Sequence, residues 1–112
     1  MATYGVVLIT VGSEAEGQAI AQALVAAKLA ACVNFFPIQS VYTWQGEICQ
    51  DPEWQLVIKT DLDQFDALAA KVQELHSYDL PEVLAWPVAT GLPAYLEWLG
   101  ANVASSEPSE PA

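Results

Sequence analysis

The stretch "ACVNFFPIQSVYTWQGEICQDPEWQLVIKT", residues 31–60, decides the fold, because it has the pattern of one long β-hairpin. β-Branched and aromatic residues are frequent on both sides of Gln45 and Gly46, a pair that is typical of a tight turn. Each arm is about 13 residues long, or roughly 40 Å at about 3.3 Å per residue. A compact domain of this size has a radius of gyration of only about 13 Å, so the hairpin is expected to project beyond its own sheet.

Two features interrupt the hairpin pattern. Pro37 divides the first arm, and "DPE" (51–53) precedes the inner part of the second arm. Proline cannot donate a hydrogen bond to a neighbouring strand, so a bulge or an edge position is expected at Pro37, and a second irregularity at 51–53. Beyond 53 the pattern becomes regular, and one face of the strand is predicted to carry Trp54, Leu56 and Ile58.

The flanking segments complete an alternating arrangement of strands and helices. Strands are expected at 3–11 and 82–89, and helices after the capping box at 13–16, over 65–75 and over 93–100. The order β-α-β-β-α-β-α is the split-βαβ, ferredoxin-like pattern of an α+β fold, with one additional C-terminal helix. We therefore predict one domain over residues 1–104, followed by a disordered acidic tail rich in proline and serine at 105–112.

The apolar content is high for a small domain. Apolar residues make up 54% of the chain and charged residues 15%, which leaves few polar groups to cover the surface. The sequence contains no run of about 18 apolar residues, so no membrane span is expected. The N-terminus lacks the basic and small-residue pattern of a signal peptide. A subunit interface therefore accounts best for the excess, and a cytoplasmic location is expected. The exposed apolar part of the hairpin, with Tyr42, Trp44 and Ile48, is the predicted interface.

The net charge excludes one class of partner. Fourteen acidic residues oppose three lysines, with no arginine, which gives a formal charge of −11. Phosphate backbones are bound by clustered lysine and arginine, so nucleic acid is not an expected partner.

The residues with metal-binding chemistry are few. The chain has one histidine, His76, and two cysteines, Cys32 and Cys49, without the close spacing of a zinc or copper motif. A complete site within one subunit is therefore not expected. A site shared between subunits, or completed by Asp79 or Glu82, stays open. The simpler alternatives are that His76 ends a helix and that Cys32 is a small core residue.

No catalytic motif is present, so the chain is not expected to be an enzyme. A ligand cleft is a separate hypothesis, because Lys59 lies near a strand end, where charged residues often line clefts. Tyr78, Trp44 and Glu82 could add stacking and polar contacts. The alternative is that Lys59 lies along the sheet and pairs with an acidic residue.

Four segments together resemble a known family. "ACVNFFPIQSVYTWQGEI", "LVIKT", "HSYDLPEV" and "GLPAYLEWL" are similar, in order and spacing, to the CutA divalent-cation-tolerance family over about residues 3–103. The resemblance implies a ferredoxin-like fold and a tight homotrimer joined through long β-hairpins. It also implies a role in tolerance to divalent metals, chiefly copper, which some members are described as binding.

The resemblance also assigns individual residues. In the loop motif, Ser77 stands where the family usually has proline, and Asp79 where it usually has glutamate. The other matching positions, by motif, are Cys32 and Asn34, then Tyr42, Trp44 and Gly46, then Lys59, and finally His76, Tyr78, Pro81 and Glu82.

These observations leave three hypotheses. The first is a homotrimeric cytoplasmic protein of the metal-ion response, with no organic cofactor, that binds copper or another divalent cation weakly through Cys32 and His76. The second is a trimer similar to the PII-type signalling proteins, with a small anion in a cleft between subunits. The third is a trimeric scaffold for a membrane or protein partner that the sequence does not identify. The predicted lining of the cleft is Lys59, Asn34, Tyr78 and Glu82.

Overall fold

The computed structural model describes residues 2–104, so the predicted tail at 105–112 lies outside the described part of the chain. Within it the strands and helices follow the predicted order. A short 3₁₀ turn, η1 (Leu62–Gln64), leads into the second helix. The elements are β1 (Tyr4–Val11), α1 (Glu14–Ala26), β2 (Cys32–Trp44), β3 (Glu47–Asp61), α2 (Phe65–Leu75), β4 (Leu84–Pro87) and α3 (Pro93–Ala101).

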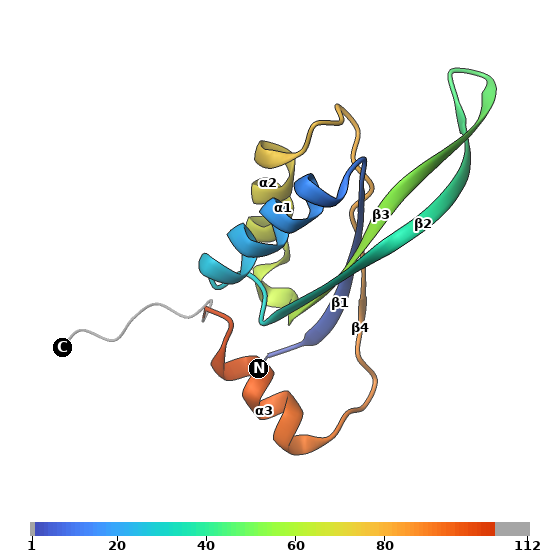
Figure 1. The fold of residues 1–112 in the computed structure, drawn as a ribbon. Coiled ribbons are helices and arrows are strands. Elements are labelled where there is room, and N and C mark those ends of the chain that lie inside the picture. The colour runs from blue at the N-terminus through green and yellow to red at the C-terminus, as the bar shows by residue number, and fades with distance from the viewer. Residues whose placement is uncertain (1, 105–112) are drawn as a thin grey trace.

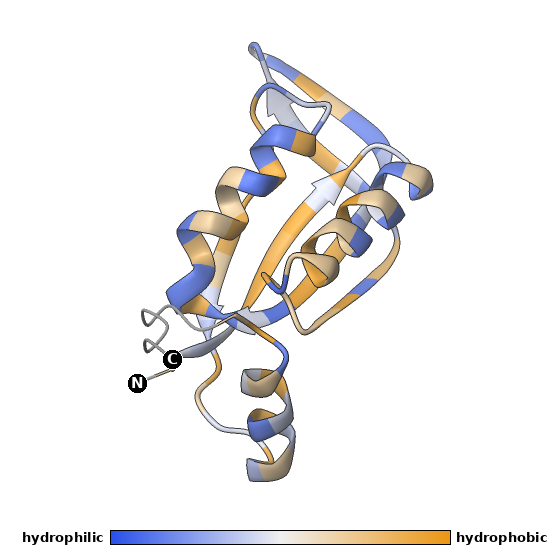
Figure 2. Ribbon diagram, turned by 90° about the vertical axis from the view of Figure 1, so that its left-hand side faces the viewer, coloured by the Kyte–Doolittle hydropathy of each residue, from blue (hydrophilic) through white to orange (hydrophobic). Residues whose placement is uncertain are grey.

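The strands form one four-stranded sheet in the order β2-β3-β1-β4, and every neighbouring pair is antiparallel. Helices α1 and α2 lie side by side on one face of this sheet, while α3 lies near the end where β1 begins (Figure 1). Viewed from the helix side, hydrophobic stretches of the strands lie behind the two helices (Figure 2). The core between these layers includes Val7, Ile9, Ile20, Leu24, Leu56, Ile58, Leu68 and Val72.

The hairpin is more regular than the sequence predicted. Its register runs without a slip from the pair Cys32 and Lys59 to the pair Trp44 and Glu47. The predicted bulge at Pro37 and the irregularity at 51–53 are therefore wrong. The alternative expectation for Pro37, an edge position, is confirmed, because β2 is an outer strand of the sheet. On such a strand the missing N–H can face away from the sheet, so no bulge is needed.

The projection of the hairpin is confirmed. A two-residue turn joins the arms, with φ of 50° at Gln45 and 80° at Gly46, as in the turns that suit twisted antiparallel strands. Strand β1 pairs with β3 only from Trp54 to Asp61, so the outer part of the hairpin has no third strand beside it. The molecule is accordingly elongated, with extents of 54 × 29 × 24 Å (Figure 1).

Helix α3 packs closely against the start of β1. A Cβ atom at Gly100 would meet the Tyr4 hydroxyl oxygen, so a larger residue there would require the Tyr4 side chain to shift. Leu99 and Val103 are buried beside this contact, and the Ala104 N–H donates to the Lys28 carbonyl. None of the helices within residues 2–104 is long and apolar enough to cross a membrane.

The sheet face opposite α1 and α2 carries exposed apolar side chains. Leu84 pairs with Leu8, and Trp86 with Val6, so these side chains project from the same face. Leu84 is 56% exposed and Trp86 46% exposed. We call this surface the open face of the sheet. Large side chains that remain exposed together on one surface are typical of an interaction site.

Candidate functional site

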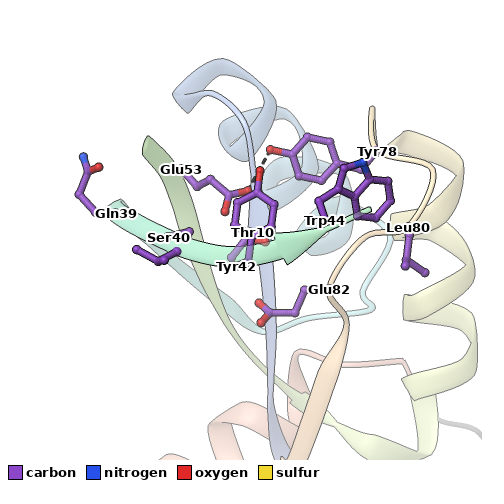
Figure 3. Close-up of a pocket in the computed structure, with 10 residues that line it drawn as sticks. Thr10, Gln39, Ser40, Tyr42, Trp44, Glu53, Tyr78, Leu80 and Glu82 are labelled. Atoms are coloured by element: carbon purple, nitrogen blue, oxygen red, sulfur yellow. Dashed lines mark hydrogen bonds between the residues drawn. The ribbon is translucent and has the colours of Figure 1, made fainter. Parts of the chain in front are cut away.

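A cavity of about 590 Å³ lies between the outer hairpin and the loop that follows α2 (Figure 3). Side chains of β2, β3 and the 76–82 loop approach one another here, although they are far apart in sequence. The ten residues that line the cavity are Thr10, Gln39, Ser40, Val41, Tyr42, Trp44, Glu53, Tyr78, Leu80 and Glu82.

Tyr78 and Glu53 form the polar centre of the cavity wall. The Tyr78 hydroxyl donates a hydrogen bond of 2.9 Å to Glu53 Oε2, and the Glu53 residue is only 9% exposed. Burial raises the pKa of Tyr78 to about 12, and the hydrogen bond to Glu53 adds to this effect. The phenol therefore stays protonated at neutral pH and keeps donating to the carboxylate.

Glu82 is the second carboxyl group of the wall. Burial raises its pKa, a hydrogen bond with Gln55 acts in the opposite direction, and the nearby charge of Glu53 raises it further. The net effect is a pKa above the ordinary value, chiefly because Glu82 is partly removed from water. No lysine is among the lining residues, so the cavity is acidic.

His76 fixes the loop that carries Tyr78. Its Nε2 lies 2.7 Å from the Thr10 carbonyl oxygen, and its Nδ1 accepts a 3.0 Å hydrogen bond from the Tyr78 N–H. A carbonyl can only accept, so Nε2 carries the proton and Nδ1 provides the lone pair. Both nitrogens of this buried ring are therefore occupied within the chain, and neither offers a free lone pair to a metal.

Glu16 holds the same loop from α1. Its carboxylate accepts hydrogen bonds from the Ser77 N–H at 2.8 Å and from the Ser77 hydroxyl at 3.0 Å. Burial acts to raise the pKa of Glu16, but these hydrogen bonds, the electrostatic effect of the neighbouring His76 and a further hydrogen bond from Gly12 outweigh it, so the pKa is lowered. A proline at position 77 could not donate the first of these bonds. The serine thus restores by hydrogen bonding some of the rigidity that a proline would supply.

This contact predicts a pH-dependent loss of stability in Glu16→Gln. Because the folded-state pKa of Glu16 lies below its ordinary value of 4.5, its contribution is complete above pH 4.5 and is lost as the pH falls through the folded-state pKa. We expect Glu16→Gln to lower the free energy of unfolding by about 1 kcal/mol at pH 7, the typical net contribution of a hydrogen bond that water can reach. Urea unfolding at a fixed protein concentration measures this difference.

Glu14→Gln is the matched control for this prediction, because Glu14 lies in the same first helical turn and is exposed. It should reproduce only the small loss of interaction with the helix dipole. If the difference in free energy of unfolding between Glu16→Gln and wild type stayed constant from pH 7 to pH 3, the stabilising role of the ionised Glu16 carboxylate would be contradicted.

The predicted metal pair, Cys32 and His76, is not brought together within one chain. Cys32 begins β2 and pairs with Lys59, whose Nζ lies 4.0 Å from the Cys32 sulfur. His76 instead contacts Thr10 and Tyr78. Within residues 2–104 no group of three or more histidine, cysteine, aspartate or glutamate side chains is placed to hold a metal ion. The described part of one chain therefore does not provide a preformed metal centre.

The four residues predicted to line one ligand cleft lie in two separate places. Tyr78 and Glu82 line the cavity, whereas Lys59 and Asn34 do not. The Lys59 ammonium group donates a 2.6 Å hydrogen bond to Asn34 Oδ1. Lys59 thus pairs with an amide on the neighbouring strand, rather than with an acidic residue as the alternative expected.

The predicted interface residues of the hairpin also lie in different surroundings. Tyr42 and Trp44 line the cavity, and the Tyr42 hydroxyl donates to Asp51 across the hairpin. Ile48 is not a lining residue and is 83% exposed. The same two aromatic residues therefore contribute both to the cavity and to the exposed surface of the hairpin.

Several residues that line or support this site were not singled out from the sequence as site residues, among them Glu53, Thr10 and Glu16. Glu53 lies in the segment interpreted as an irregularity, and Thr10 in a strand with no other distinguishing feature. Glu16 was interpreted only as part of a capping box. Half of that motif is confirmed, because the Ser13 hydroxyl accepts from the Glu16 N–H. The Glu16 carboxylate binds Ser77 as well, and no local pattern predicts that contact.

The fold and the cavity define a small α+β protein with a four-stranded antiparallel sheet, a projecting hairpin and an acidic, aromatic cavity. Residues 5–102 match the family described as CutA1 divalent ion tolerance protein, and the chain belongs to this family. The family and its members are described by a role in divalent-cation tolerance.

Individual relatives agree with this assignment. The divalent-cation tolerance protein CutA of Thermus thermophilus is 49% identical over 98 residues, which is 87% of this chain and 95% of the relative. The chloroplastic protein CutA 1 of Oryza sativa is 46% identical over 84% of this chain, which spans 54% of that relative. The crystal structure of CutA1 from Oryza sativa matches with a TM-score of 0.91 at 42% identity, over 94% of this chain and 97% of the other.

Proposed function

We propose that the chain acts in divalent-cation tolerance as a homotrimer in the cytoplasm, with weak binding of copper. The observation that carries this proposal is the family match over residues 5–102. The sheet order β2-β3-β1-β4, with α1 and α2 on one face, supports the ferredoxin-like description on which such an assembly is built.

The surface of the single chain supports assembly. On the open face, Leu84, Trp86 and Phe36 are each between 44% and 56% exposed. The hairpin adds Val41 at 66% exposure and Ile48 at 83%. Burying this surface against other copies would remove apolar area from water at about 25 cal/mol per Å². A closed ring is the expected form, because open addition of subunits leads to fibres.

Of the two predicted metal ligands, Cys32 is a better candidate than His76 for direct contact with copper. A thiolate is a soft ligand that suits copper(I), and Cys32 is a free cysteine with partial exposure. His76 could join it only by giving up its hydrogen bond with Thr10 or Tyr78. Because one chain offers no preformed site, binding of copper is expected to be weak, or to need ligands from more than one subunit.

Competition for copper(I) against a coloured chelator, in the absence of oxygen, tests the direct contact. We expect Cys32→Ala to lower the affinity at least about tenfold, the size of effect expected when a soft ligand is lost. His76→Gln keeps an amide N–H that can donate to Thr10, and we expect it to change the affinity much less. Equal affinity of wild type and Cys32→Ala would exclude this contact. Growth of a copper-sensitive bacterium that expresses the chain tests tolerance separately from binding.

The alternative of a small anionic metabolite receives less support. It requires a cation in the ligand cleft, and Lys59 pairs with Asn34 away from the cavity in the single chain. No observation within residues 2–104 favours an anion in the cavity itself.

A further inference from the structure

The cavity combines aromatic rings with negative charge. Trp44, Tyr42 and Tyr78 contribute three aromatic rings, and Glu53 and Glu82 contribute two carboxyl groups (Figure 3). The hydrogen bond to Asp51 raises the pKa of Tyr42 to about 12, and burial raises that of Tyr78 to about 12, so both rings stay neutral. The faces of neutral aromatic rings attract cations.

Glu53 has no cationic partner in the described part of the chain. Its residue is 9% exposed, and the hydrogen bond to it comes from the neutral hydroxyl of Tyr78. Within residues 2–104 the ion pair of Lys71 with Glu74 lies on α2, and His76 Nδ1 lies 3.8 Å from Glu16, so neither contact reaches the cavity. A carboxylate that is removed from water without a positive partner is unfavourable, and a bound cation would compensate it.

The size and the donor set of the cavity distinguish between kinds of cation. A volume of about 590 Å³ is within the usual range for small-molecule sites and far exceeds that of a single metal ion. The carboxylates are also not gathered with a third ligand as a metal would require. An ammonium group needs only aromatic faces and one or two carboxylates around it.

We propose that this cavity binds a small organic cation, a compound with a quaternary or primary ammonium group. The ammonium group lies against the rings of Trp44 and Tyr78, close to the carboxylate of Glu53. This site goes beyond the proposed role in divalent-cation tolerance and does not depend on Cys32 or on copper.

Isothermal titration with choline and with its uncharged analogue 3,3-dimethyl-1-butanol tests the proposal. The two molecules have similar shapes, so a difference in affinity reports the positive charge. We expect choline to bind the assembled protein with a Kd of about 1 mM or tighter. The uncharged alcohol should bind at least about tenfold more weakly, because it lacks the attraction to the rings and the carboxylate. Putrescine provides a second probe with primary ammonium groups.

Variants locate the site. Glu53→Gln keeps an acceptor for the Tyr78 hydroxyl but removes the charge, so it should weaken choline binding at least about tenfold. Glu97→Gln makes the same change in charge on the exposed surface of α3 and should leave binding unchanged. Gel filtration of both variants checks that the assembly is intact. Equal binding of choline and the alcohol, equal binding by wild type and Glu53→Gln, or no saturable binding of choline or putrescine would each overturn the proposal.

Discussion

Leu84→Asp is expected to convert the assembled protein into single chains. Leu84 lies on β4, is 56% exposed in one chain and belongs to the open face that the proposed trimer covers. A carboxylate buried at such a contact without a cation costs several kcal/mol, and each copy would contribute one. The chain already carries a charge of −11, so nearby cations are scarce.

Light scattering coupled to gel filtration measures this effect. Wild type should have a mass near three times the 12.1 kDa of one chain, and Leu84→Asp a mass near that of one chain. Far-UV circular dichroism checks that the variant remains folded. In an isolated chain, a change at so exposed a position is expected to alter stability by no more than about 0.5 kcal/mol.

Val25→Asp is the matched control. Val25 is 43% exposed, so its exposure is similar, but it lies on α1 and therefore on the opposite side of the sheet. It should leave the mass unchanged. A trimeric Leu84→Asp variant would exclude β4 from the interface, and a wild type with the mass of one chain would exclude the trimer itself.

The sequence predicts those parts of the fold that depend on local patterns. The stripe of apolar residues at helical spacing placed α2, and the turn at Gln45 and Gly46 placed the end of the hairpin. The length of the two arms was sufficient to predict that the hairpin projects. Each of these features depends on residues within a few positions of one another, where periodicity and turn chemistry are informative.

The details that failed depend on the position of a strand within the sheet. A proline is disruptive in a central strand and harmless on an edge, and only the sheet order shows that β2 lies at the edge. With that order known, Pro37 pairs opposite Trp54 without a bulge. The strand then continues through 51–53 and carries Glu53 into the cavity wall.

The contacts of the candidate site are long-range, and this is why the sequence predicted its members better than its geometry. Tyr78 and Glu82 do line the cavity, but His76 binds the carbonyl of Thr10, 66 positions away in the chain. Lys59 and Asn34 meet because β2 and β3 pair in one particular register. A spacing along the chain cannot predict such pairs before the register is known.

The largest loss of stability is expected for Leu56→Ala. Leu56 lies at the centre of the sheet on β3, paired with Ile9 on one side and Phe35 on the other, and is fully buried beneath the helices. Truncating a buried leucine removes apolar contacts and leaves a cavity, which costs about 2–5 kcal/mol. Since small domains have free energies of unfolding of about 5–15 kcal/mol, this is a large fraction of the total.

Urea unfolding of Leu56→Ala at the same protein concentration as wild type measures the loss, because the proposed assembly would make the apparent stability depend on concentration. Leu80→Ala is the matched control, since it makes the same chemical change at a residue that is 74% exposed. It should change the free energy of unfolding by no more than about 0.5 kcal/mol. A decrease of less than about 1 kcal/mol in the free energy of unfolding of Leu56→Ala would mean that the helices do not pack against β3 as described. Truncating a leucine at a well-packed site costs more than that.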